Sequence, residues 1–142
     1  MTEITFYTFA GNPLDVARRI AAKAYGQGKQ VMIYAPDAPT ADAIDRLMWT
    51  TPPLGFVPHC RDNDALAGET PVLIGTDANA LGSADVMINL HTGQPPSFAR
   101  FERLVEIVGM DDAGVEQGRE RYRFYKTRGY ALKTHDLRQH AG

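Results

Sequence analysis

The chain has 142 residues, of which 44% are hydrophobic, and this length suits one domain with a sizeable core. Its single cysteine, Cys60, excludes an internal disulfide, and no charged-then-apolar leader opens the sequence, so we expect a cytoplasmic protein. No apolar run approaches the roughly 20 residues that a membrane helix requires, which argues against membrane anchoring.

Charge is distributed unevenly along the chain. Residues 114–142 carry seven Lys and Arg against three acids, a net +4, which leaves eight basic residues against 14 acids, a net -6, in the rest. The near-neutral total of -2 hides this polarity. Cations clustered among aromatic residues predict a surface on which an anionic partner docks.

Taken in chain order, the first elements alternate between strand and helix patterns. Residues 4–9 combine apolar, β-branched and aromatic side chains, which predicts a strand. Asn12 and Pro13 then predict the N-cap and first position of a helix that extends over residues 14–25. A short apolar run at residues 30–34 indicates a buried strand.

A second helix is predicted over residues 37–49, where apolar side chains recur at helical spacing. Residues 51–59 then contain four Gly or Pro, which predicts an extended surface loop. The remaining predictions are strands at 71–75, 85–90 and 104–108, an N-cap region at 111–112, a basic helix at 115–128, a terminal strand at 129–132 and a loose tail at 134–142.

Alternating strands and helices predict a single α/β domain over residues 1–142, Rossmann-like, with a mostly parallel sheet and helices on both faces. Such folds often bind nucleotides at the first strand-to-helix turn. Here that turn has a single glycine, Gly11, and no Gly-Lys-Ser/Thr follows it. The only Gly-Lys pair, Gly28-Lys29, follows a helix instead of a strand, so the chain lacks a P-loop and nucleotide hydrolysis is disfavoured.

Catalytic and metal-binding patterns are also weak. His59 and Cys60 are adjacent, and adjacent side chains rarely orient as base and nucleophile. His91, His135 and His140 lack the spacing of metal ligands. We therefore expect no catalytic residue, no metal and no cofactor.

The basic helix presents a stripe that combines cations with a tyrosine ring. We expect Phe124, on the opposite side, to anchor the helix to the sheet. The stripe suits a short peptide that carries a carboxylate and an apolar side chain; the alternative is an ordinary solvated amphipathic helix. Its members, which lie within about 100° of one another, are Val115, Arg119, Tyr122, Arg123 and Lys126.

A second candidate surface follows the helix that ends near Trp49. Pro52, Pro53 and Pro58 stiffen the next segment, which also carries Phe56. Large apolar groups on a stiff loop predict a hot spot for a partner, because little entropy is lost on binding. The alternative is that Trp49 and Phe56 cover the edge of the sheet as part of the core.

Several of these pieces, in the same order and along nearly the whole chain, resemble the chi subunit of the bacterial DNA polymerase III holoenzyme. The most specific pairing is Phe56-Val57-Pro58-His59 after a Trp-bearing helix together with Arg119-Glu120-Arg121-Tyr122. The other matching pieces are Phe6-Tyr7, Gly28-Lys29-Gln30-Val31, Asp45-Arg46-Leu47-Met48-Trp49 and Gly129-Tyr130.

The resemblance implies a non-enzymatic adaptor in the clamp loader assembly that contacts DNA only indirectly. It implies that the acidic C-terminal tail of single-stranded DNA-binding protein, which ends in Pro-Phe, binds at the basic stripe. Arg119 would then hold the terminal carboxylate, Tyr122 and Val108 would line the Phe pocket, and Arg123 and Lys126 would attract upstream aspartates. It also implies that Trp49, Pro52 and Phe56 bind the psi subunit and, in some relatives, a helicase-like partner.

Two other classes of function compete with this interpretation. The basic helix, with Tyr122, Phe124 and Tyr125 as stacking groups, is also a candidate for direct binding of single-stranded nucleic acid. The acidic remainder of the chain argues against that interpretation, because it would repel a long polyanion. An enzyme, such as a hydrolase that uses the sheet edge, is the third class.

Overall fold

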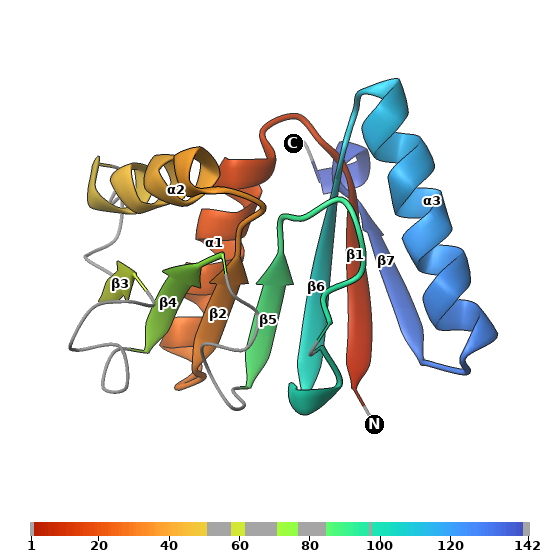
Figure 1. The fold of residues 1–142 in the computed structure, drawn as a ribbon, viewed down its shortest axis with the longest axis horizontal. Coiled ribbons are helices and arrows are strands. Elements are labelled where there is room, and N and C mark those ends of the chain that lie inside the picture. The colour runs from red at the N-terminus through yellow and green to blue at the C-terminus, as the bar shows by residue number, and fades with distance from the viewer. Residues whose placement is uncertain (1, 51–57, 62–70, 77–84, 97, 141–142) are drawn as a thin grey trace.

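The computed structural model describes residues 2–50, 58–61, 71–76, 85–96 and 98–140. Within this part of the chain, seven strands form one sheet in the order β3-β4-β2-β5-β6-β1-β7, and every neighbouring pair is parallel (Figure 1). The elements are β1 (Glu3–Ala10), α1 (Pro13–Gly26), β2 (Val31–Tyr34), α2 (Ala38–Thr50), β3 (His59–Arg61), β4 (Val72–Gly75), β5 (Val86–Asn89), the 3-10 helix η2 (Phe98–Arg100), β6 (Arg103–Gly109), α3 (Asp112–Thr127), β7 (Leu132–Asp136) and the 3-10 helix η3 (Leu137–His140). The predicted α/β, Rossmann-like class is confirmed.

Helices cover both faces of the sheet. On one face, the α1 residue Ala21 and the α2 residue Ile44 share a buried cluster with Ile33 of β2. On the other face, Tyr125 of α3 packs in a second cluster with Met32 of the same strand. Neighbouring strand residues thus point to opposite faces, and Figure 1 shows α3 beside β1, β6 and β7. The helix α3 therefore covers one face of the sheet at its β6-β1-β7 end.

Local capping explains where the helices begin. The Asn12 side chain accepts a hydrogen bond from the Asp15 backbone N–H at 3.2 Å, and Pro13 occupies the first position of α1. The Asp111 carboxylate likewise accepts from the Gly114 N–H at 3.0 Å at the start of α3. Each cap satisfies a backbone donor that the helix leaves free, as the sequence predicted.

The loop predicted for residues 51–59 needs a correction at its end. Residues 51–57, which include Pro52 and Phe56, lie outside the described residues. His59 is buried and begins β3, a strand that the sequence did not predict, and it pairs in register with Val72 of β4. The strand was not predicted because it is only three residues long and follows directly after the Gly and Pro residues of the expected loop.

Residues 134–140, which belong to the tail expected to be loose, lie in the strand β7 and the 3-10 helix η3. The expected terminal strand begins later, at Leu132, after a turn in which Gly129 has φ +82. Thr134 and Asp136 belong to β7, which pairs with β1. The strand β7 lies at the edge of the sheet, and most of its residues are exposed and polar. Its sequence therefore lacks the apolar pattern by which the buried strands were predicted.

Candidate functional site

A groove of about 310 Å³ lies between α3 and the carboxyl-terminal ends of β1 and β6. Apolar side chains and backbone form most of its lining. One arginine, Arg119, lies among the lining residues and supplies a positive charge there. The lining residues are Phe6, Thr8, Phe9, Val108, Gly109, Val115, Gly118, Arg119, Tyr122 and Thr134.

Three of the five residues predicted to bind a peptide tail meet in this groove. Val108 is buried, Tyr122 is half-buried and Arg119 is exposed, so the apolar groups form the wall and the guanidinium remains accessible. The Tyr122 ring meets the Phe6 ring edge-on at a centroid distance of 5.3 Å, an arrangement that favours one ring orientation. Within the described residues, no carboxylate lies within ion-pair distance of Arg119.

The other two predicted residues lie beside the groove and not in it. Arg123 and Lys126 are exposed on α3, one and two helical turns beyond Arg119, and neither lines the cavity. Their charges extend the positive surface along the helix. Capture of upstream acidic residues suits this position better than recognition of a terminal residue.

A close approach of α3 to β6 shapes the groove, and the sequence analysis missed it. Gly118 faces Val108, and a Cβ added to this glycine would lie 2.8 Å from Val108 Cγ2. Ordinary carbon contacts are about 3.5–4.0 Å, so any side chain at this helical position would force α3 or Val108 to shift. The groove residues Arg119 and Tyr122 are therefore held at a distance from β6 that Gly118 sets.

Behind the groove, α3 is tied to the sheet by a buried polar network. The Glu106 carboxylate of β6 accepts hydrogen bonds from Arg121 Nε at 3.1 Å, Tyr125 Oη at 2.6 Å and Asn89 Nδ2 at 2.8 Å. Arg121 Nη1 also donates to the Thr92 carbonyl at 2.6 Å. The network therefore joins α3 to β6 and to the segment after β5.

Burial governs the ionisation of this network. Burial raises the pKa of Glu106 to about 7, against the opposing effects of Arg121 and the hydrogen bonds from Tyr125 and Asn89. Burial and the adjacent Glu106 carboxylate both raise the pKa of Tyr125 above its usual value, so its hydroxyl stays a donor. Each of the polar side chains thus has the partner that its burial requires.

The face of α3 that meets the sheet differs from the one predicted. Gly118, Arg121 and Tyr125 are its buried residues, whereas the expected anchor Phe124 is only half-buried. The Arg128 guanidinium carbon lies 3.8 Å from the centroid of the Phe124 ring. The predicted stripe did not include Arg121, but nothing local in the sequence reveals that this arginine pairs with Glu106 in the core.

Trp49, from the second predicted surface, lies at the end of α2. Trp49 is 57% exposed, which overturns the alternative that this residue belongs to the core. Its ring meets the His59 ring edge-on at a centroid distance of 5.0 Å. Pro52 and Phe56, the other members of this surface, are outside the described residues, so their place beside Trp49 stays a prediction.

Comparison with known proteins places these features in a family. Residues 1–133 match the family model described as DNA polymerase III chi subunit, HolC. The chain belongs to this family. It is 33% identical to the DNA polymerase III subunit chi of Pseudomonas aeruginosa, over 96% of this chain and 98% of the relative. Subunits chi of Haemophilus influenzae and Escherichia coli are each 32% identical, over 87% and 81% of this chain and 86% and 79% of the relatives.

Membership of the chi family makes this chain an accessory subunit of DNA polymerase III, as the resemblance in the sequence implied. In the described part of the chain, no three His, Cys, Asp or Glu side chains gather as metal ligands would. None of the described helices has both the length and the apolar character needed to cross a bilayer.

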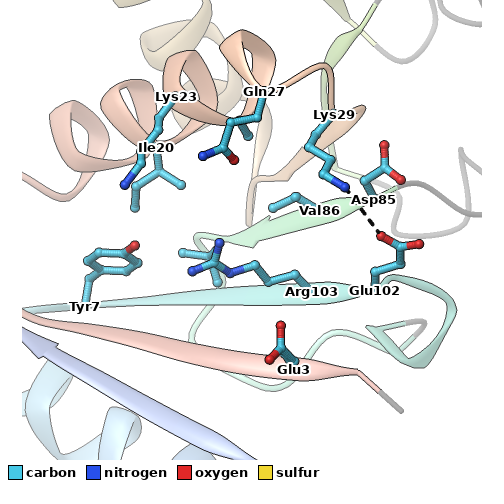
Figure 2. Close-up of a pocket in the computed structure, with 12 residues that line it drawn as sticks. Glu3, Tyr7, Ile20, Lys23, Gln27, Lys29, Asp85, Val86, Glu102 and Arg103 are labelled. Atoms are coloured by element: carbon cyan, nitrogen blue, oxygen red, sulfur yellow. Dashed lines mark ion pairs between the residues drawn. The ribbon is translucent and has the colours of Figure 1, made fainter.

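A second cavity, of about 230 Å³, lies between α1 and the amino-terminal ends of β5, β6 and β1 (Figure 2). Its charges are mixed, because Lys23 and Arg103 line it together with Glu3 and Asp85. Lys29, also in its lining, lies 4.0 Å from a Glu102 carboxylate oxygen. Opposite charges at close quarters suit an anionic ligand less well than the groove beside Arg119 does, so the groove is the candidate site.

Proposed function

We propose that the groove binds the acidic C-terminal tail of single-stranded DNA-binding protein. Arg119 holds the terminal carboxylate by charge-assisted hydrogen bonds, and Tyr122 and Val108 enclose the terminal Phe ring. Arg123 and Lys126 attract the aspartates upstream of that ring. The observation that carries this proposal is the apolar groove with the exposed Arg119 guanidinium beside it.

The dimensions and polarity of the groove support one apolar residue as its occupant. A cavity of about 310 Å³ lies at the lower end of the range for ligand pockets, which is about 300–1,000 Å³. Val115 and Phe6 extend the apolar wall formed by Val108, so an aromatic side chain finds contact on several sides. A peptide that ends in Phe thus presents its ring and its carboxylate to matching groups.

We further propose that the surface formed by Trp49, Pro52 and Phe56 binds the psi subunit or an equivalent clamp loader component. An exposed tryptophan is the kind of residue that dominates binding energy at protein interfaces. The chain would then act as a non-enzymatic adaptor, with single-stranded DNA-binding protein at α3 and the polymerase assembly at α2.

A labelled peptide ending in Asp-Asp-Ile-Pro-Phe tests the proposed tail site. We expect Arg119→Ala to weaken binding by about 1.5–3 kcal/mol, the usual contribution of a hydrogen bond to a charged group. Arg128→Ala is the matched control, because Arg128 is an exposed arginine of the same region that does not line the groove. Unchanged affinity in the Arg119→Ala variant, or an equal loss in both variants, would reject the assigned groove.

The buried position of Tyr125 argues against direct nucleic-acid binding by α3. This ring is fully buried and its hydroxyl donates to Glu106, so it is not accessible as a stacking group for a base. Tyr122 and Phe124, the other two proposed stacking groups, are half-buried. A gel shift with a bare oligonucleotide at moderate salt separates the two functions, and binding as tight as that of the tail would favour nucleic acid.

A further inference from the structure

The groove has a second wall at the carboxyl-terminal end of β1, which is formed by residues outside the basic stripe. Phe9 lines the groove and has φ 59, in the left-handed region that a bulky residue rarely adopts. The pairing of β1 with β6 shifts in register between Tyr7 and Ala10, around this residue. Such a conformation is strained, and strained residues cluster at binding sites.

Arg138, which follows β7, lies directly against this strained residue. Its guanidinium carbon is 3.5 Å from the centroid of the Phe9 ring. Asp136 holds it in place by accepting hydrogen bonds from Arg138 Nε at 3.1 Å and Nη2 at 2.7 Å. The Arg138 side chain nevertheless remains 60% exposed. A cation is thus held in one orientation against Phe9, a residue that lines the groove.

The lining of the groove shows in which direction it extends. On α3, no described residue beyond Tyr122 lines it, so it does not follow the helix toward Arg123 and Lys126. It extends instead over Thr8 and Phe9 of β1 and Thr134 of β7. A peptide with its last residue beside Tyr122 and Arg119 therefore has further surface to follow at the β1–β7 end.

Free donors at that end, rather than net charge, can bind an acidic residue, because Arg138 is already paired with Asp136. An arginine has five N–H donors, and the two side-chain bonds to Asp136 leave donors on Nη1 and Nη2 for a second carboxylate. Little side-chain entropy remains to be lost, because Asp136 and the Phe9 ring already hold the guanidinium.

We infer that Arg138 is a further binding residue of this site, which contacts an acidic residue upstream of the C-terminal Phe across the Phe9 ring. The inference rests on the proposed tail-binding function. It gives the site two cations, with Arg119 in the groove for the terminal carboxylate and Arg138, beside Phe9 and outside the lining, for a side-chain carboxylate. Arg123 and Lys126 then act over a longer range, along α3.

Two peptides separate a direct contact from a structural role. One ends in Asp-Asp-Asp-Ile-Pro-Phe and the other in Asn-Asn-Asn-Ile-Pro-Phe, so they share the terminal residues and differ in charge. We expect Arg138→Gln to weaken the Asp peptide about two- to fivefold, the range for an exposed ion pair, and to leave the Asn peptide unchanged. Arg138→Lys, which keeps the charge, is expected to retain most of the affinity.

The matched control is Arg128→Gln, which removes an exposed arginine that also lies over a Phe ring, at 3.8 Å, without adjoining the groove. We expect this variant to bind both peptides as the wild type does. Equal losses for the two peptides in Arg138→Gln would mean that Arg138 only supports Phe9, and would overturn the inference. So would an unchanged affinity for the Asp peptide, or an equal loss in the Arg128→Gln variant.

Failure of the proposed function gives a different result. In that case the wild type binds neither peptide, or Arg119→Ala binds them as well as the wild type does, and the inference falls with the function. If Arg119→Ala weakens both peptides and Arg138→Gln weakens neither, the groove binds the tail and only the role of Arg138 is rejected.

Discussion

Replacement of Gly118 by alanine tests whether the contact between α3 and β6 sets the geometry of the groove. The added methyl group would lie 2.8 Å from Val108 Cγ2 and 3.0 Å from Val108 Cγ1. Val108 is β-branched and has little rotamer freedom, so α3 must move outward by several tenths of an ångström. Overpacking of this kind costs about 1–3 kcal/mol, and the better helix propensity of alanine returns about 1 kcal/mol.

We therefore expect Gly118→Ala to lower the free energy of unfolding by about 1 kcal/mol in urea denaturation. The tail peptide should bind more weakly, by about threefold or more, because Arg119 and Tyr122 move relative to Val108. Addition of Val108→Ala should relieve the clash, so the two substitutions should be non-additive in stability by about 1 kcal/mol.

Gly26→Ala is the control, because a Cβ at Gly26, the last residue of α1, meets no atom within 4 Å. Its stability should change by less than about 0.5 kcal/mol. The reasoning is refuted if Gly118→Ala stabilises the protein by the full propensity difference, or if its effect simply adds to that of Val108→Ala. Either result would mean that Gly118 and Val108 are not in close contact.

Two further predictions concern the elements that support the groove. Burial raises the pKa of Glu106 from 4.5 to about 7, so between these pH values the folded protein holds a proton that the unfolded chain has released. The free energy of unfolding should therefore fall as pH rises through this window, by up to about 3 kcal/mol. In urea titrations, the free energy of unfolding of Glu106→Gln should depend less steeply on pH. An equally steep dependence would mean that a group other than Glu106 causes the effect. Asp111→Ala removes the N-cap of α3 and should lower the free energy of unfolding by about 1 kcal/mol, whereas an unchanged value would show that the cap contributes little.

Local signals in the sequence predicted most of the fold. The positions of β1, α1, β2, α2 and α3 follow from apolar periodicity and from capping residues such as Asn12 and Asp111. These signals act within one turn of helix or one strand, so they can be read from the sequence without knowledge of tertiary contacts. The short strand β3 was missed, and the polar strand β7 was expected too early in the chain, because pairing with β4 and β1, at a distance in the sequence, defines them.

The candidate site divides in the same way. Arg119 and Tyr122 were predicted from the charge and helical spacing of the last fifth of the chain, and from its resemblance to the chi family. The roles of Gly118, Phe9 and Arg138 left no local signal. Each depends on contact with a residue far along the chain, as in the 3.5 Å approach of Arg138 to the Phe9 ring.

The sequence by itself determined the α/β class, the helix caps, the absence of a phosphate-binding loop and the family. Only the tertiary structure decided which cations face the solvent. Arg119 and Arg121 are two residues apart in one basic run, yet the first lies exposed at a groove and the second is buried against Glu106. The helical rotation of about 200° between them turns one side chain outward and the other inward, and the packing of α3 on β6 selects which is which.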